Sequence, residues 1–199
     1  EQITRKDFDL PEEGFLFACF NSNKKIRPEE FDIWMRLLQK VDKSIIWLYK
    51  SNEFVIENLK EEAEKRNVSS DRLFFAQRLP FKEHLARYTI CDLFLDTFNY
   101  NGHTTTSDAL WAGLPVLTMQ GNSFSARVSS SMLNSLGLNE LITKNIKDYE
   151  KKALFLSQNN DELLEIKKKL GKSKEKAPFF NSKLFTKNLE KIFINLVKN

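Results

Sequence analysis

Short apolar runs alternate with segments of helical periodicity over the first 145 residues of the chain. The apolar runs predict strands at 14–21, 44–50, 72–77, 92–97, 115–119 and 140–143. Between them, the spacing of apolar residues predicts helices over 28–41, 52–67, 80–90, 104–113 and 123–137. This alternation is typical of a parallel sheet with helices on both faces, and near-continuous apolar strands are typical of a sheet that is buried on both sides. The predicted fold class is therefore α/β, with a doubly wound parallel sheet.

The pattern changes after Asn145, where the remaining segments carry helical periodicity. These predicted helices cover 146–158, 160–173 and 182–199. A length of 199 residues suits one domain. We therefore expect a Rossmann-like core over residues 1–145 and a helical C-terminal tail over 146–199 that packs on the same domain.

The net charge is +4, and its excess is local, because six lysines and two glutamates lie between residues 165 and 176. We interpret this stretch as the solvated face of a helix. A charge this small does not indicate a nucleic-acid partner, so none is expected.

The cysteines and the hydropathy of the sequence indicate the cellular compartment that we expect for the protein. Cys19 and Cys91 each lie in an apolar run, which predicts two buried core residues and no disulfide framework. We therefore expect a reducing, cytoplasmic setting. No stretch of about 18 apolar residues is present, so no membrane partner is expected. The chain lacks an initiator methionine, and we expect it to be a fragment of a longer protein. Core packing is predicted for the tryptophans Trp34, Trp47 and Trp111.

A polar cluster, "NGHTTTSDALWAG", lies between a predicted strand and a predicted helix. Ligands of open α/β sheets bind at this edge, outside the carboxyl ends of the strands. Gly102 allows a tight turn or a close approach of the backbone to a ligand. Thr104 and Thr105 lie where the free amides and the dipole of a helix favour an anion, and Asp108 could accept a hydrogen bond from a sugar hydroxyl. A helix cap alone accounts for one of these residues, not for the set.

Other polar residues follow neighbouring strands at the same predicted edge. The only two histidines, His84 and His103, both lie there, and an imidazole can stack on a base or donate to a phosphate. Lys25 follows the first strand in "NSNKKIRP", where a lysine can meet an anion, although taken alone it reads as an ordinary loop lysine. Arg127 follows the fifth strand, and a phosphate contact and a surface ion pair explain it equally well.

Two common nucleotide-binding motifs are absent from the sequence. No G-x-G-x-x-G follows the first strand and no G-x-x-x-x-G-K-[ST] occurs, which argues against a dinucleotide-binding Rossmann enzyme and a P-loop NTPase. The single Asp-x-Asp, at Asp7 and Asp9, precedes the first strand, away from the predicted ligand edge. We interpret it as a surface loop and expect no metal site there.

The segment "DTFNYNGHTTTSDALWAGLP", Asp96 to Pro115, has a distinctive spacing of polar and small residues. Upstream lie "FN" followed by "KI" and then Pro28, and further matches occur in "EHLARY" and in the closing "PFFNSKLFTKNLEKIF". Through these segments the chain resembles the protein O-GlcNAc transferase (SPINDLY-like) glycosyltransferases over nearly its whole length. The resemblance implies the carboxyl-terminal half of a GT-B glycosyltransferase, in which two Rossmann-like domains face each other across a cleft. It also implies an amino-terminal catalytic half and tetratricopeptide repeats in the full-length protein.

The activity that the resemblance implies is an inverting, metal-independent transfer of a sugar to Ser or Thr of a protein or peptide acceptor. The implied donor is UDP-N-acetylglucosamine, with no cofactor and no metal beyond that UDP-sugar donor. We expect the isolated fragment to bind UDP and to turn over poorly.

Site residues follow from the resemblance position by position. Lys25 is implied to lie on the diphosphate and to stabilise the leaving group. The other implied donor-binding residues are His84 against the uracil, Arg87 in support of the base-binding helix, His103, Thr104 and Thr105 on the phosphates, and Asp108 on the ribose.

This chain departs from the family pattern at two positions beside the implied donor. Ser22 stands where the family often has Gln, and Phe81 aligns with a lysine that lies beside the uridine, with Lys82 one residue further on. Transfer of glucose to asparagine and transfer of fucose from GDP-fucose therefore stay open. So does a non-catalytic module that binds a nucleotide sugar, while a nucleic-acid binder is the weakest alternative.

Overall fold

The computed structural model describes residues 3–198 and contains a six-stranded, all-parallel sheet in the order β3-β2-β1-β4-β5-β6. This is the Rossmann strand order, and it confirms the predicted doubly wound α/β class. The strands are β1 (Leu16–Cys19), β2 (Ile45–Tyr49), β3 (Leu73–Ala76), β4 (Leu93–Leu95), β5 (Val116–Met119) and β6 (Ile142–Thr143).

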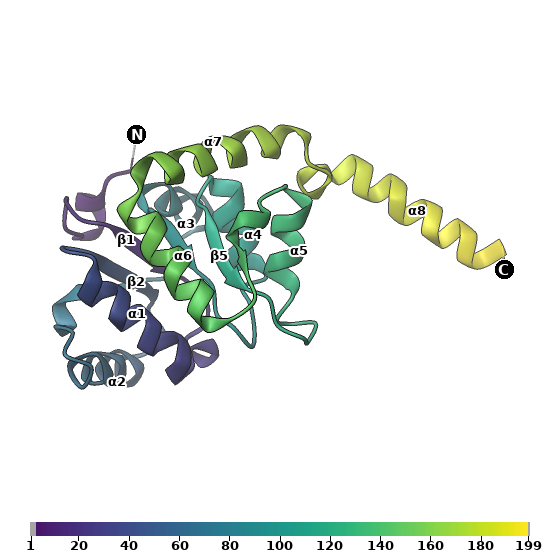
Figure 1. Cartoon of the computed structure of the whole chain (residues 1–199). Coiled ribbons are helices and arrows are strands. Elements are labelled where there is room, and N and C mark those ends of the chain that lie inside the picture. The colour runs from purple at the N-terminus through teal and green to yellow at the C-terminus, as the bar shows by residue number, and fades with distance from the viewer. Residues whose placement is uncertain (1–2, 199) are drawn as a thin grey trace.

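Helices cover both faces of the sheet (Figure 1). They are α1 (Pro28–Lys40), α2 (Glu53–Glu64), α3 (Phe81–Arg87), α4 (Thr104–Ala112), α5 (Val128–Ser135), α6 (Ile146–Gln158), α7 (Asn160–Lys176) and α8 (Ser182–Lys198). On one face α1 packs against α6, and on the other α3 packs against α4. The central strands are buried on both sides, as their near-continuous apolar sequences predict.

The predicted burial of the cysteines and of two tryptophans is confirmed, and that of the third tryptophan is not. Cys19 and Cys91 are free and buried, and Trp34 and Trp47 lie in the core. The prediction was wrong for Trp111, which is 48% exposed. It lies at the end of α4, where its ring meets Phe180 at 5.2 Å between centroids instead of facing the sheet.

The segment after β5 differs from the predicted helix over 123–137. The helix α5 begins only at Val128, because residues 123–127 form turns in which the Ala126 amide donates to Ser123 O. One of these turn residues, Ser125, accepts a hydrogen bond from the amide of Asn101, at 2.9 Å. The turn therefore supports the polar cluster that follows β4.

The C-terminal helices differ in how they meet the sheet. Tyr149, Ala153 and Leu156 of α6 are buried, so this helix completes the core. The helix α7 runs past the amino ends of the strands, where Lys167 donates to the carbonyl of Cys91. By contrast α8 projects away from the rest of the chain (Figure 1), and most of its large apolar side chains are exposed. The division of the chain at residue 145 into a core and a tail stays a prediction.

None of the helices in the described part of the chain combines the length and the apolar composition that a bilayer crossing requires.

Candidate functional site

The candidate site lies where the strand order reverses, between β1 and β4. The crevice at such a switch point, outside the carboxyl ends of the strands, is where open α/β sheets bind ligands. Two segments border it. The first follows β1 and contains a short 3₁₀ helix, Asn23–Lys25, and the second runs from the end of β4 to the start of α4. The polar residues that we predicted to share this edge lie after strands or within the first two turns of helices.

Asn21 joins the two segments. Its side chain is buried, and its Nδ2 donates to Asp96 Oδ1 at 3.0 Å and to Thr97 Oγ1 at 2.9 Å. Its Oδ1 accepts a hydrogen bond from the hydroxyl of Thr105 in the first turn of α4. One buried amide thus fixes the end of β1, the end of β4 and the start of α4 relative to one another.

Two buried carboxylates hold the loop after β4 in place. Asp96 accepts hydrogen bonds from the amide of Gly102 at 2.7 Å and from Thr118 Oγ1 at 2.8 Å. On the other side, Glu30 accepts from the amide of Phe98 at 2.7 Å. Burial raises the pKa of both carboxyl groups, and the donated hydrogen bonds oppose that rise. Asp96, Glu30 and Asn21 were not predicted as site residues. For Asn21 and Asp96 the sequence did hold a signal, because each is a polar residue close after a buried strand.

Gly102 is packed too closely for any other residue. A Cβ built at this position would lie 2.5 Å from Thr106 Oγ1, 2.6 Å from Thr105 Oγ1 and 2.7 Å from Asn21 Oδ1. The close approach of this loop to the start of α4 therefore requires glycine, whereas the approach to a ligand suggested from the sequence stays a prediction.

Lys25 faces the loop after β4 from the other side of the crevice. Its Nζ donates to the carbonyl of Asn101 at 2.9 Å and lies 4.1 Å from the centroid of the Tyr100 ring. Burial lowers the pKa of Lys25, and the charge of Asp96 opposes that effect. Among the ion pairs of residues 3–198, none includes Lys25. Its ammonium is thus held at the site by a carbonyl and an aromatic face, with no carboxylate partner within the described chain.

His103 precedes the first turn of α4 and lies on the same aromatic ring. The rings of His103 and Tyr100 are stacked, with 5.0 Å between centroids and 25° between planes. The Nε2 of His103 is buried without a hydrogen-bond partner in the described structure. Thr104 and Thr105 follow as the first residues of α4, where backbone amides are free of intrahelical partners. We call Lys25, Tyr100, His103 and Thr105 the loop cluster.

A second group of predicted residues lies on the neighbouring helices α3 and α4. The Nδ1 of His84 contacts the guanidinium of Arg87, and its Nε2 lies 3.6 Å from Asp108 Oδ2 and 3.3 Å from the Tyr88 hydroxyl. Burial and the charge of Arg87 lower the pKa of His84 to about 4. The imidazole is therefore neutral at physiological pH. We call His84, Arg87 and Asp108 the helix cluster.

Arg87 is itself buried and acts as the base of this cluster. Its guanidinium donates to the carbonyl of Gln77 at 2.7 Å and lies 4.4 Å from the centroid of the Phe20 ring. Tyr88 connects the two clusters, because its hydroxyl also approaches the carbonyl of Thr105 at 3.4 Å. The first turn of α4 is therefore common to both.

Three residues discussed from the sequence lie at the margin of these clusters. Phe81 and Lys82 begin α3 with exposed side chains. Arg127 is exposed at the start of α5 and lines a cavity of about 570 Å³ together with Phe124. The ring of Phe124 lies 6.2 Å from that of His103, so this cavity adjoins the loop cluster.

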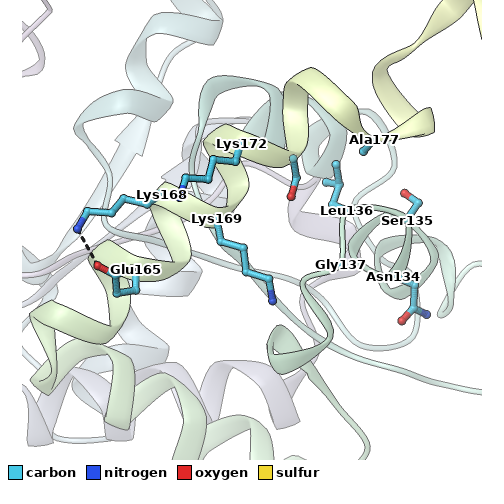
Figure 2. Close-up of a pocket in the computed structure, with 10 residues that line it drawn as sticks. Asn134, Ser135, Leu136, Gly137, Glu165, Lys168, Lys169, Lys172 and Ala177 are labelled. Atoms are coloured by element: carbon cyan, nitrogen blue, oxygen red, sulfur yellow. Dashed lines mark hydrogen bonds and ion pairs between the residues drawn. The ribbon is translucent and has the colours of Figure 1, made fainter.

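The lysine-rich stretch lies at the opposite edge of the sheet from the candidate site, near the amino ends of the strands. Figure 2 shows Lys168, Lys169 and Lys172 on α7 beside the end of α5, around a cavity of about 530 Å³. Lys168 pairs with Glu165 and Lys169 with Glu140, each at 2.7 Å. These partners lie within the chain and the lysines are largely solvated, which agrees with a solvated helix face.

Acidic residues do not gather into a metal site in the described structure. Asp7 and Asp9 are exposed near the amino terminus, and the carboxylate of Asp7 accepts hydrogen bonds from Thr4. Within residues 3–198, no three His, Cys, Asp or Glu side chains are grouped so that they could hold a metal ion.

Comparison with known proteins places the chain as a whole in an enzyme family. The model of glycosyl transferase family 41 matches residues 2–189. The chain is 34% identical, over 96% of its length, to the Arabidopsis thaliana protein named probable UDP-N-acetylglucosamine–peptide N-acetylglucosaminyltransferase SEC. It is 32% identical, over 94% of its length, to the Caenorhabditis elegans UDP-N-acetylglucosamine–peptide N-acetylglucosaminyltransferase.

The fold matches as well. A solved O-GlcNAc transferase of Thermobaculum terrenum, the K341M mutant, superposes on 90% of this chain with a TM-score of 0.84 and 30% identity. The chain spans only a part of each of these three proteins. It covers 20% of the Arabidopsis relative, 16% of the Caenorhabditis relative and 35% of the solved bacterial chain.

Proposed function

This chain belongs to glycosyl transferase family 41, and from that premise we propose that it is the donor-binding domain of a protein glycosyltransferase. The proposed donor is a uridine-diphosphate sugar, UDP-N-acetylglucosamine, and the proposed acceptor is Ser or Thr of a protein. The names of the plant and nematode relatives support this assignment of donor. The remainder of the enzyme, including the surface that binds the acceptor, would come from sequence outside this chain.

One observation carries the proposal. Within the described residues, three features meet at one switch point: the half-buried Lys25 with no acidic partner, His103 Nε2 with no hydrogen-bond partner, and the amino end of the nine-residue helix α4. The ammonium and the helix terminus favour an anion, because both are positive and the backbone amides are free donors, and an imidazole N–H can donate to the same anion. In the proposed complex the diphosphate lies in the loop cluster.

The helix cluster suits the other half of the donor. Asp108 lies about one helical turn beyond Thr104 on α4, and the neutral His84 on α3 lies 3.6 Å from it. In the proposed complex His84 lies against the uracil and Asp108 accepts hydrogen bonds from ribose hydroxyls. The guanidinium of Arg87 contacts Nδ1 of His84 and holds the imidazole in place, so the proposed role of Arg87 is positioning.

The proposed reaction is a single displacement with inversion. The acceptor oxygen bonds to the anomeric carbon as the bond from that carbon to the diphosphate oxygen breaks, and UDP leaves with the electron pair. The acceptor proton passes to a base outside this chain. Lys25 and the amides of α4 would stabilise the charge that grows on the diphosphate, and one such donor is worth about 3 kcal/mol of barrier. No metal ion is required in this scheme, so we expect a chelator to leave UDP binding unchanged.

The decisive test is calorimetric titration of the chain with UDP. We expect binding that Lys25→Ala weakens at least about tenfold, because the variant loses a charged donor at the diphosphate. Lys24→Ala is the matched control, because Lys24 is exposed and adjacent in sequence. Equal losses in both variants would show that only the overall charge matters and would contradict the proposed site.

Titration with GDP in parallel tests the base. Preference for GDP would overturn the uridine assignment and favour the fucosyl alternative. A full-length protein that binds UDP-N-acetylglucosamine but transfers no sugar would favour a non-catalytic binding module.

A further inference from the structure

Tyr100 is the centre of the loop cluster, and no role follows for it from the sequence pattern. The ammonium of Lys25 lies 4.1 Å from the centroid of its ring, and the imidazole of His103 is stacked on it at 5.0 Å. Tyr100 is 47% exposed, so its ring reaches solvent at the carboxyl edge of the sheet. The ring therefore links two residues that come from different segments, one after β1 and one before α4.

The backbone holds this ring in a fixed place. The carbonyl of Tyr100 accepts a hydrogen bond from Thr97 Oγ1 at 2.6 Å. The next residue, Asn101, is buried, and its side chain donates to the carbonyl of Thr97 at 2.8 Å. Its amide donates to the carbonyl of Ser125. Tyr100 thus lies in a turn that hydrogen bonds to Thr97 and to Ser125 hold in place.

The contact between the ring and Lys25 can persist when an anion binds. An ammonium carries three N–H donors, and the carbonyl of Asn101 takes one of them. A cation over an aromatic face is attracted by the ring quadrupole and needs no particular donor. The remaining donors of Lys25 are therefore free for a ligand while the ring restricts the motion of its long side chain. Restricting the side chain in advance lowers the entropy lost on binding.

We infer that Tyr100 is a positioning residue of the donor site, whose ring holds Lys25 and His103 together so that both meet one diphosphate. This inference rests on the proposed function. It assigns the effect to the aromatic face and not to the phenolic hydroxyl. Phenylalanine at position 100 should therefore keep the affinity for the diphosphate, whereas an aliphatic residue there should lower it.

The test compares three ligands on the full 199-residue chain by calorimetry: UDP, pyrophosphate and uridine. We expect Tyr100→Leu to weaken UDP and pyrophosphate about three- to tenfold, the range of a partly desolvated cation–π contact, and to leave uridine unchanged. Tyr100→Phe should bind all three as the wild-type chain does. A matched control is Phe155→Leu on α6, since Phe155 is 44% exposed and also has a lysine over its ring, Lys152 at 5.6 Å. That variant should change none of the affinities.

Three of the four outcomes separate this inference from the proposed function. UDP binding that Tyr100→Leu leaves intact would overturn the role of Tyr100 and leave the donor site standing. Equal weakening of uridine and UDP would reveal a general structural effect and would also overturn it. A loss of pyrophosphate binding on Tyr100→Leu, in a chain that does not bind UDP, would support Tyr100 and reject the uridine donor. A wild-type chain that binds none of these ligands would overturn both proposals.

Discussion

His84 shows how the surroundings of a single residue define what it can do. Its ring contacts Arg87 and lies near the Tyr88 hydroxyl and Asp108, and burial together with the guanidinium charge lowers its pKa to about 4. A neutral imidazole cannot pair with a phosphate as a cation. It can stack on a base, which is the role that we propose for it.

The titration of His84 can be measured directly. The folded pKa, about 4, lies below the ordinary 6.5, so the unfolded chain takes up the proton first as pH falls. The stability that depends on neutral His84 is therefore present above about pH 6.5 and is lost as pH falls toward 4. We expect an NMR titration of the ring to show protonation only near pH 4, and a midpoint close to 6.5 would contradict this environment.

Gly102 gives a second prediction at this scale. Gly102→Ala places a methyl group within 2.7 Å of three side-chain oxygens, so we expect a loss of about 1–3 kcal/mol in the free energy of unfolding. Urea unfolding followed by circular dichroism measures it. The control is Gly171→Ala on α7, where nothing lies within 4 Å of the added atom and helix propensity favours alanine. If both variants unfold like the wild type, the loop is not packed as described.

Single residues also show what the sequence could and could not reveal. Lys25, His84, His103 and Asp108 were predicted at one edge because each lies after a strand or within the first two turns of a helix, and parallel strands bring those positions together. The roles of Asn21 and Tyr100 were missed. Each depends on which side chain of another segment it meets, and spacing along the chain carries no such information.

At the scale of elements, α1 and α6 are joined by a charged clamp. The guanidinium of Arg36 donates to both oxygens of Glu150, at 2.7–3.1 Å, and Lys40 donates to the same carboxylate at 2.8 Å. These cations lower the pKa of Glu150 from 4.5 to about 2, chiefly through the hydrogen bond from Arg36. The carboxylate therefore holds the two helices together across one face of the sheet.

The clamp predicts a particular dependence on acid. Because the folded pKa is depressed, its stabilisation is present above pH 4.5 and is lost as pH falls toward 2. We expect Glu150→Gln to cost about 1 kcal/mol at neutral pH, a modest value because both cations are partly solvated. Urea unfolding should show that this difference shrinks on acidification. Glu165→Gln, which removes an exposed pair with Lys168, should have no measurable effect, and a constant penalty at all pH values would refute the clamp.

Helix and strand boundaries were predictable to within a few residues, with one instructive exception. Strands and helices were found because burial imposes a period on their sequences. The segment 123–127 carries residues that fit a helix, yet it forms turns because Ser125 accepts a hydrogen bond from the loop after β4. A tertiary contact therefore sets the start of α5.

For the whole molecule, a ligand that binds only the folded chain must stabilise all of it. We expect UDP at about one hundred times its dissociation constant to add about 2.7 kcal/mol to the free energy of unfolding. The urea midpoint with and without UDP measures this gain. At the same UDP concentration Lys25→Ala should gain less, whereas Lys24→Ala should gain as much as the wild type. A midpoint that saturating UDP leaves unmoved would contradict binding to the native fold.

The tie made by Asn21 also has a consequence for the order in which the molecule is built. Asn21 forms hydrogen bonds with Asp96 and Thr105, which lie 75 and 84 positions further along the chain. Closing so long a loop is slow compared with forming a helix. A nascent chain can therefore form its first strands and helices while the ligand pocket does not yet exist. The proposed nucleotide binding should begin only after these distant segments have come together, which makes it a report on the completed folding of the site.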